Sequence, residues 1–145
     1  MYNILITSVG GTLAPFLIHK IKNGKFKDLK ITGTNQSNNC NAKYFLDNFA
    51  ITPNGNSKKY ISSIKKIIKK FNINLLIPGS DEEALKLSKN LKYFKKKKCI
   101  IATVDFKTLN IFSDKNRTYQ ALKKKNLPFP EFDIIKNSNE IKNKI

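Results

Sequence analysis

The distribution of hydrophobic residues predicts short buried strands that alternate with amphipathic helices. Apolar runs at 4–8, 29–34, 74–77 and 99–102 have the length of strands and lack strict alternation. Strands of this kind are buried on both faces, which is typical of a parallel sheet covered by helices. We therefore expect a doubly wound, mostly parallel α/β fold with helices on both faces and these four segments as its central strands.

Two shorter segments are expected to be extended as well. Residues 49–51 form an apolar run that ends at Pro53. Residues 132–135 form another, after the proline-containing segment 127–130. We expect both to be strands.

The first helix is expected between the first two strands. Thr12 is a suitable N-cap, Pro15 is tolerated in the first turn, and Asn23 with Gly24 ends the helix. Its apolar stripe is expected to consist of Leu13, Phe16, Leu17 and Ile21.

The clearest helical pattern follows Ser57, which is suited to cap it. Lysines lie opposite an apolar stripe that comprises Tyr60, Ile61, Ile64, Ile67, Ile68 and Phe71. A basic amphipathic helix can also lie on a membrane surface. Because a buried strand follows at once, we favour packing of this helix on the sheet.

Two further helices are expected, one after segment 74–77 and one after segment 99–102. One is capped by Ser80 or Asp81 and carries an apolar side with Ala84, Leu87 and Leu91. The lysine run 95–98 is expected to be solvated. The last helix begins near Asp114 and carries Tyr119 and Leu122.

The net charge of +18 raises the possibility of nucleic-acid binding. All but one of the 28 basic residues are lysines, and Arg117 is the exception. Arginine is the usual reader of bases and phosphates. Lysine, asparagine and isoleucine share A/T-rich codons, so codon bias accounts for all three excesses. We therefore expect neither a nucleic-acid partner nor a membrane partner.

The composition also bounds the compartment and the metal chemistry. The N-terminus has no basic segment before its apolar run, as a secretory signal would, and no apolar run is long enough to cross a bilayer. We therefore expect a cytoplasmic protein. Cys40, Cys99 and the single His19 do not form a disulfide framework or a metal site. Cys99 is expected to be buried, Cys40 to lie in a loop and His19 to lie on the surface.

The loop after the first strand is the first candidate site. Ligands of such sheets bind outside the carboxyl ends of the strands. Glycines let the backbone approach a ligand, and the free N–H groups at a helix N-terminus favour an anion. The candidate residues are Ser8, Gly10, Gly11 and Thr12. A tight turn without a ligand explains the glycines equally well.

The loop does not fit a dinucleotide site. The glycine spacing of that fingerprint is missing, and the second strand ends in Thr34 and Asn35 rather than in an acidic residue. A loop of the Walker A type is also absent from the sequence. An NAD-dependent enzyme is therefore disfavoured.

A second candidate site follows segment 74–77. Asp81, Glu82 and Glu83 occupy the first turn of the predicted helix, after Ser80. Helix capping and compensation of the helix dipole account for such carboxylates. The functional interpretation is that one carboxylate faces the cleft and holds a substrate amine or hydroxyl. We assign Ser80, Asp81 and Glu82 to substrate binding, and no catalytic residue is assigned.

In order along the chain, these segments resemble the opening of ATP-grasp ligases. Residues 4–10, 31–35, 47–53 and 74–82 are similar to successive motifs of proteins related to the carbamoyl-phosphate synthase large subunit. Residues 113–130 resemble the segment that leads into the ATP-binding domain, with Asn126 in place of the usual glycine. Asn35 stands where many members have aspartate. The resemblance covers essentially the whole chain.

The resemblance implies a Rossmann-like pre-ATP-grasp domain at 1–113, followed at 114–145 by a linking helix and the start of an ATP-grasp domain. It implies ligation of a small carboxylate to an amine through an acyl phosphate, with ATP and Mg²⁺ bound in the full-length enzyme. Lys115 matches a lysine that approaches the ATP phosphates. We expect this chain alone to be inactive and to bind neither cofactor tightly.

Two points stay open at this level. A stand-alone ligand-binding α/β module without catalysis is the alternative function. The resemblance leaves open a homodimer, and it does not identify the carboxylate or the amine.

Overall fold

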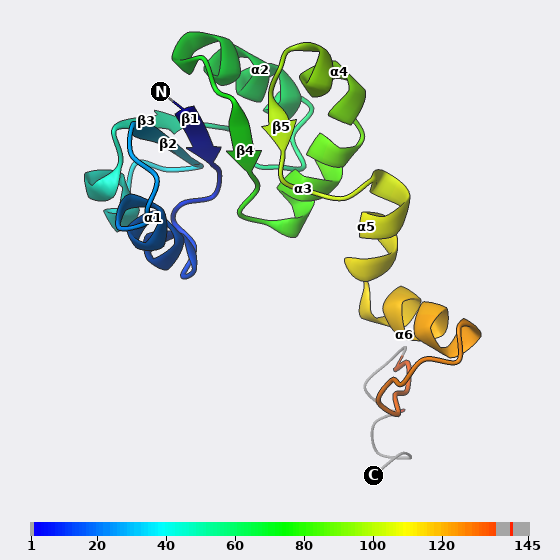
Figure 1. Cartoon of the computed structure of the whole chain (residues 1–145). Coiled ribbons are helices and arrows are strands. Elements are labelled where there is room, and N and C mark those ends of the chain that lie inside the picture. The colour runs from blue at the N-terminus through cyan, green and yellow to red at the C-terminus, as the bar shows by residue number, and fades with distance from the viewer. Residues whose placement is uncertain (1, 136–139, 141–145) are drawn as a thin grey trace. The chain divides into compact units, whose positions relative to one another are not determined.

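The computed structural model describes residues 2–135 and residue 140. Its centre is a five-stranded parallel sheet in the order β3-β2-β1-β4-β5 (Figure 1). The strands are β1 (Tyr2–Ile6), β2 (Leu29–Asn35), β3 (Asn48–Ile51), β4 (Leu75–Ile77) and β5 (Ile100–Ile101). The predicted parallel α/β fold is confirmed.

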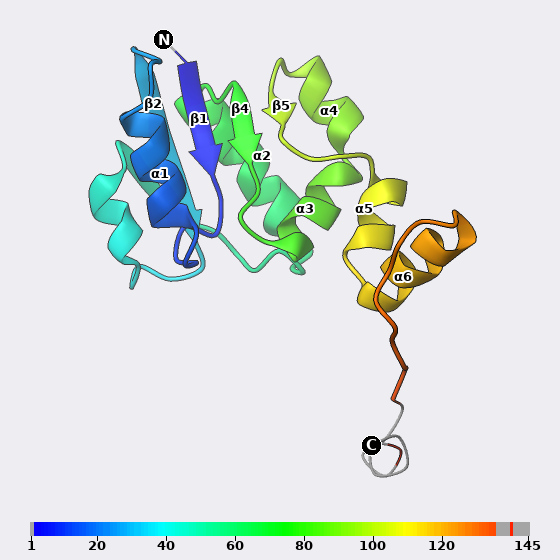
Figure 2. The ribbon, with the colours of Figure 1, turned by 60° about the horizontal axis from the view of Figure 1, so that its bottom comes forward.

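Helices connect successive strands and continue after the last one. They are α1 (Ala14–Lys22), the 3₁₀ helix η1 (Asn41–Phe45), α2 (Tyr60–Phe71), α3 (Asp81–Ser88), α4 (Leu91–Lys96), α5 (Phe106–Phe112) and α6 (Lys115–Lys124). Figure 2 shows α1 on one face of the sheet and α2 and α3 on the other. The sheet is therefore doubly wound, as predicted.

Alternate residues of β1 enter two separate cores, one on each face of the sheet. Leu5 contacts a cluster built mainly from α2, α3 and α4. Ile4 and Ile6 contact a second cluster formed with α1, β2 and the residues near η1. Burial on both faces explains why the strand sequence is apolar without alternation.

The Cys99 segment is not a central strand. The order of the described strands places β5 at one end of the sheet and β3 at the other. Ile101 is buried against the α2–α4 cluster, whereas Ile100 is 69% exposed. The apolar run therefore reflects burial on one face, and the prediction of a central position was wrong.

The expected strand at 132–135 is also absent from the described part of the chain, in which these residues have no regular structure. A strand requires a neighbouring strand for its hydrogen bonds. Phe132 instead packs its ring 4.9 Å from that of Tyr119 and 6.3 Å from that of Phe129. Its hydrophobicity is thus used in a local aromatic contact.

The buried face of α1 agrees only in part with the predicted one. Leu17 and Ile21 pack against the core as predicted, beside the buried Ala14 and Ile18. Leu13 and Phe16 are instead 80% and 64% exposed. Thr12 is not the N-cap, because the helix starts one residue later, after Leu13, without a side-chain cap. Residues spaced three and four apart fit more than one helical stripe, so packing on the sheet decides which one is buried.

The second helix shows the predicted stripe but a different start. Tyr60, Ile64, Ile67 and Ile68 are buried. Lys59 occupies the N-cap position, and the Ser57 hydroxyl accepts a hydrogen bond from the Lys59 N–H in the preceding turn. Ser57 therefore shapes the approach to the helix rather than its cap.

The region after β4 contains more helices than were predicted. Ser80 caps α3 by accepting a hydrogen bond from the Glu83 N–H, but the expected single helix is divided into α3 and α4. The sequence interpretation did not include α5. Asp105 marks its start, because its carboxylate accepts hydrogen bonds from the Thr108 N–H and hydroxyl, which also lower its pKa.

The chain forms two compact units, Met1–Leu109 and Asn110–Ile145. The division lies within α5. The domain boundary expected after residue 113 remains a prediction. Asp114 caps α6 through the Arg117 N–H, as expected for the last helix.

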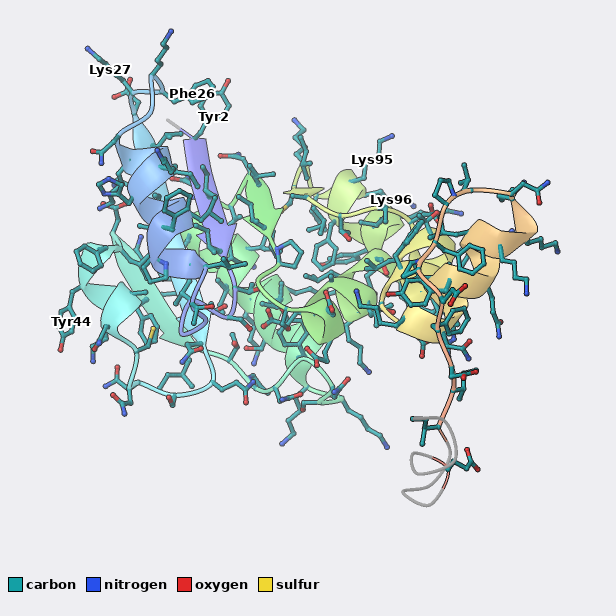
Figure 3. All side chains as sticks on the ribbon, turned by 90° about the horizontal axis from the view of Figure 1, so that it is seen from below. Tyr2, Phe26, Lys27, Tyr44, Lys95 and Lys96 are labelled. Carbon is teal, nitrogen blue, oxygen red and sulfur yellow. The ribbon has the colours of Figure 1, made fainter. Side chains whose placement is uncertain are left out.

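Several side chains of the first unit have the exposure expected from the sequence. Cys99 is buried and His19 is exposed. Cys40 lies just before η1 and is buried, so it is part of a core rather than a free surface thiol. Lys95 and Lys96 are exposed (Figure 3).

Among the described residues, no helix combines the length and apolarity needed to cross a membrane.

Candidate functional site

A pocket lies at the carboxyl edge of the sheet, at the point where the order in which strands are added to the sheet reverses. From β1 the chain leads to β2 on one side, and β4 lies on the other side of β1 (Figure 2). Such a switch point leaves a crevice that helices do not cover. The pocket there has a volume of about 300 Å³. Its lining comprises Ile6, Thr7, Ser8, Gly11, Thr12, Leu13, Ala14, Leu17, Ile77, Pro78 and Gly79.

Three of the predicted loop residues line this pocket. Ser8, Gly11 and Thr12 belong to its wall, and Gly10 lies beside them in the same loop. Ser8 takes the left-handed conformation with φ of 50°, and the Gly11 N–H donates to the Ser8 carbonyl at 3.0 Å. Neither glycine has positive φ. The turn is therefore made by Ser8 rather than by the glycines.

Gly10 lies in close contact with the side chain of Asn35. The Gly10 N–H donates to the Asn35 side-chain oxygen at 3.3 Å. A Cβ on Gly10 would lie 2.9 Å from the Asn35 amide atoms. The Asn35 amide also donates to the Ser37 carbonyl at 3.2 Å. Asn35 thus joins the loops that follow β1 and β2, a role the sequence did not reveal.

The carboxylate that points inward is Glu83. Asp81 and Glu82 are exposed, and Ser80, Asp81 and Glu82 are not part of the pocket wall. Glu83 is 3% exposed and accepts a hydrogen bond of 2.5 Å from the Thr7 hydroxyl. The predicted residues Ser80, Asp81 and Glu82 thus lie outside the pocket wall. Glu83 is connected to the wall through its hydrogen bond with Thr7.

Thr7 is the centre of a small buried network under the pocket. Its hydroxyl donates to Glu83 and accepts from the Gly79 N–H at 3.1 Å. The backbone approach here is close, since a Cβ on Gly79 would lie 2.1 Å from the Thr7 carbonyl oxygen. Burial, and then the charge of Glu83, raise the pKa of the Tyr60 hydroxyl well above its usual value. The network fixes the β1 and β4 loops relative to each other.

The described lining of the pocket contains no charged residue. It combines the hydroxyl residues Thr7, Ser8 and Thr12 with apolar residues such as Leu17 and Ile77. A small anion would therefore be held by hydroxyl and backbone N–H groups rather than by an ion pair.

Lys115 belongs to the other compact unit. It is the first residue of α6, follows the cap Asp114 and is exposed. The pocket residues belong to the unit Met1–Leu109. The described residues include no group of three or more His, Cys, Asp and Glu placed to hold a metal ion. No metal-dependent step is derived from this chain.

The comparison with known proteins agrees with this fold. The sequence model of one family, described as PylC-like, N-terminal domain, matches residues 4–102. The chain belongs to this family. The match covers the whole sheet from within β1 to just beyond β5. The resemblance to the N-terminal domain of ATP-grasp ligases is thereby confirmed, and no curated protein matches the sequence.

Solved structures with the same fold are N-terminal parts of longer ATP-grasp ligases. The biotin carboxylase domain of a single-chain bacterial carboxylase is 12% identical, with a TM-score of 0.65 over 99% of this chain and 33% of its own. The N5-carboxyaminoimidazole synthetase from Staphylococcus aureus, complexed with ADP, is 15% identical, with a TM-score of 0.65 over 99% and 35%.

A third structure is glycinamide-RNase-transformylase T from Mycobacterium tuberculosis. It is 8% identical, with a TM-score of 0.67 over 97% of this chain and 37% of its own. At these identities the likeness concerns the fold. This PylC-like domain spans about a third of the length of the structures it matches.

Proposed function

We propose that this PylC-like domain is the substrate-side part of an ATP-grasp ligase that joins a carboxylate to an amine through an acyl phosphate. The observation that carries the proposal is the pocket of about 300 Å³ at the switch point between β1 and β4. Crevices at this position of an open parallel sheet are where ligands bind.

The lining of the pocket supports a small carboxylate as its occupant. Its volume lies at the lower end of the range for small-molecule sites, which is roughly 300–1,000 Å³. Ser8 and Thr12 offer hydroxyls beside the N-terminus of α1, whose partial positive charge favours an anion. Gly11 leaves room for the ligand against the loop backbone.

ATP and Mg²⁺ are proposed to bind outside the unit Met1–Leu109, with Lys115 approaching the phosphates. A carbamoyl-phosphate-synthase-like reaction, a cytoplasmic location and a homodimer are part of the same proposal. The domain alone is expected neither to hydrolyse ATP nor to bind it tightly. Calorimetry with MgATP tests this, and a micromolar dissociation constant would contradict it.

The site can be tested with Gly11→Ala in the enzyme produced from the complete coding sequence. Gly11 has no positive φ, and an added Cβ would meet only the Ser8 carbonyl oxygen at 3.4 Å, an ordinary contact. The fold should therefore be kept, while the methyl group reduces the space for the ligand. We expect a rise in KM for the carboxylate of about tenfold, which corresponds to about 1.4 kcal/mol.

Gly24→Ala is the control, because Gly24 follows α1 at its far end and does not line the pocket. Its Cβ would lie 3.2 and 3.3 Å from the carbonyl oxygens of Lys20 and Ile21, a slightly tighter fit than at Gly11. Its KM should stay within about twofold of the unsubstituted enzyme. Equal effects of the two substitutions would reject the pocket as the carboxylate site.

A ligand-binding module without catalysis is the second candidate. It is favoured by the lack of a metal-binding group among residues 2–135 and 140. Assays of the protein produced from the complete coding sequence distinguish the two functions. If that protein binds a small anion but forms no ADP with any carboxylate and amine, it is a ligand-binding module and not a ligase.

A further inference from the structure

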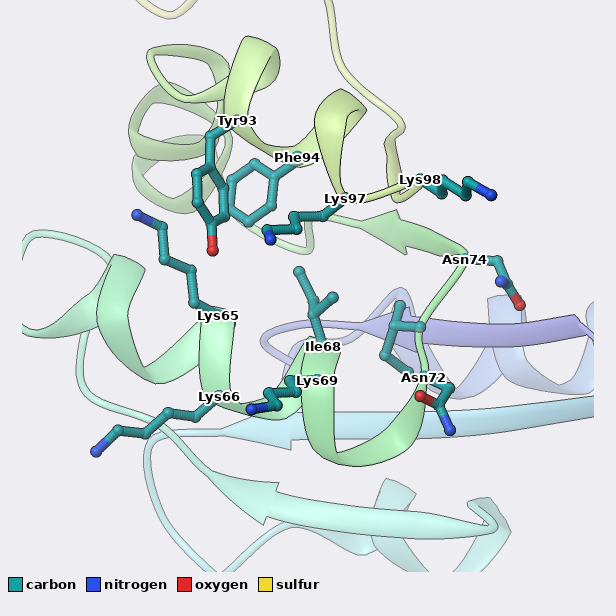
Figure 4. Close-up of a pocket in the computed structure, with 11 residues that line it drawn as sticks. Lys65, Lys66, Ile68, Lys69, Asn72, Asn74, Tyr93, Phe94, Lys97 and Lys98 are labelled. Carbon is teal, nitrogen blue, oxygen red and sulfur yellow. The ribbon is translucent and has the colours of Figure 1, made fainter.

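A second and larger pocket lies at the opposite, amino edge of the sheet. It has a volume of about 590 Å³ and lies between the end of α2 and the end of α4 (Figure 4). Lysines from two segments line it, together with Tyr93, Phe94, Ile68, Ile73, Asn72 and Asn74. The lysines are Lys65, Lys66, Lys69, Lys97 and Lys98. We refer to it as the lysine pocket.

The charge of this pocket is not balanced by its own lining. None of the described residues that form its wall carries a carboxylate. The ends of α2 and α4 bring a partial negative charge of about half an electron each. Five lysine charges therefore exceed the roughly one negative charge that two helix ends supply. The remainder attracts anions from solution.

The pocket offers defined contacts beside its charges. The Lys65 ammonium lies 3.8 Å from the centre of the Tyr93 ring, a cation–π contact that holds it at the pocket wall. Figure 4 shows the end of Lys65 on one side of the Tyr93 ring and the end of Lys97 on the other, whereas Lys98 extends away. Lys65 and Lys97 therefore flank Tyr93, and a ligand that spans the free edge of its ring would contact both.

The walls are fixed by the core and by hydrogen bonds. Phe94 is fully buried, and its ring meets that of Tyr93 edge to face at 5.3 Å. The Asn74 side-chain oxygen accepts from the Asn3 N–H at 2.9 Å, and the Asn72 carbonyl accepts from the Asn3 amide at 3.1 Å. These contacts hold the backbone and the rings of the wall in place before a ligand binds, which lowers the cost of binding.

We propose that the lysine pocket binds a ligand that carries two or more phosphate groups. Its volume suits a small molecule. Readers of nucleic-acid bases rely largely on arginine, and the sole arginine, Arg117, lies in the other unit. The proposal concerns the edge of the sheet opposite the switch-point pocket, so it is independent of the proposed ligase function.

The test uses sodium tripolyphosphate, titrated into the 145-residue chain at low salt. Because exposed charges each contribute little, we expect a dissociation constant of roughly 0.1–1 mM. Amide shifts in two-dimensional NMR spectra should concentrate at residues 65–74 and 93–98. The double variant K65Q/K97Q should bind at least tenfold more weakly.

The variant K22Q/K25Q is the control, since it removes the same charge from exposed lysines of the α1 side that do not line the pocket. Its affinity should stay within about twofold. Equal weakening in both variants would overturn the proposal, because net charge alone would then explain binding. Shifts spread over the whole surface, or no saturation by 10 mM, would also overturn it.

Two further experiments distinguish a free phosphate-bearing ligand from a lipid headgroup and from a nucleic acid. Sedimentation with phosphatidylcholine vesicles, with and without a phosphoinositide, tests for a lipid headgroup, and failure to bind them leaves a free ligand. A short DNA oligonucleotide that binds more tightly than tripolyphosphate, and equally well to K65Q/K97Q, would replace the proposal with nucleic-acid binding. Weak MgATP binding that K65Q/K97Q removes belongs to this pocket and not to a ligase site.

Discussion

The two compact units of the PylC-like chain differ in what stabilises each of them. The unit Met1–Leu109 contains both hydrophobic clusters, and all residues of the core lie in it. In the unit Asn110–Ile145, none of the described residues is buried. The first unit has the burial that an independently stable domain requires, whereas residues 110–135 and 140 of the second do not supply it.

Local interactions account for the helix of the second unit. Asp114 caps α6, and Asn126 ends it in a left-handed conformation with φ of 53°. The Arg117 guanidinium donates to the Asn110 side-chain oxygen at 2.9 Å. Capping and turn contacts can define where a helix begins and ends without a core. The comparison shows that a well-defined helix is not evidence of a stable domain.

The largest difference between the units should appear when a leucine is shortened. Leu76 is fully buried in the first unit, whereas Leu122 of α6 is only partly buried. Leu76→Ala should lower the free energy of unfolding by about 2.7–5 kcal/mol. Leu122→Ala should lower it by less than about 1 kcal/mol. Urea unfolding monitored by circular dichroism measures both, and similar losses would show that the second unit shares a core.

Thiol reactivity provides a second contrast. Burial raises the pKa of the Cys99 thiol from 9.0 to about 11. The reactive thiolate is thus roughly a hundredfold scarcer at pH 8, because each pKa unit is a factor of about ten. In a Cys40→Ser background, Cys99 should react with iodoacetamide at least about a hundredfold more slowly than a cysteine introduced as Ala121→Cys in α6.

The pH dependence of the two thiols sharpens this test. The raised pKa of Cys99 favours the protonated folded state, so its stabilisation is complete below about pH 9 and is lost as the pH rises toward 11. The rate at Cys99 should keep rising through pH 10, while that of Ala121→Cys levels off near pH 9. Coincident pH profiles would contradict the assigned burial.

A functional contrast follows from the proposed ligase. In the complete enzyme, Lys115→Ala should raise the KM for ATP more than that for the carboxylate, whereas Gly11→Ala should do the reverse. Loss of one charge-assisted contact costs about 1.5–3 kcal/mol, or roughly ten- to a hundredfold. Steady-state kinetics distinguish the two, and unchanged ATP kinetics would make Lys115 an ordinary surface lysine.

The smallest effect is expected from the helix caps. Ser80→Ala and Asp114→Ala each remove one capping hydrogen bond, of α3 and α6 respectively. Each should cost about 1 kcal/mol. Ser80→Ala should lower the stability of the whole first unit, whereas Asp114→Ala should reduce only the helix signal of α6. Asp114→Asn should be mild, because asparagine caps equally well, and a large loss would assign Asp114 another role.

Much of the first unit could be predicted because its signals are local. Strand segments at 29–34 and 74–77 and the stripe of α2 follow from the spacing of apolar residues. Ser80 and Asp114 could be identified as caps from their position before a helical pattern. The glycine-rich loop after β1 could be recognised as a candidate site because strand ends meet at one edge of a parallel sheet.

Other features were decided only by the tertiary structure. Leu13 and Ala14 are neighbours in the sequence, and packing on the sheet determines that Ala14 is buried and Leu13 exposed. Residues 132–135 have strand-like composition, but Phe132 contacts Tyr119 instead of a neighbouring strand. Apolar periodicity records which residues avoid water and does not specify the surface that covers them.

The polar contacts of the site depend on the tertiary structure most strongly. Thr7 and Glu83 are 76 residues apart in sequence and form a buried hydrogen bond. The lysines of the lysine pocket come from α2 and from the segment after α4, which only the folded chain brings together. The sequence by itself determined most of the strands and helices of the first unit, because their signals repeat within a few residues. The sites required the fold, because their residues meet only when strands distant in sequence become neighbours in the sheet.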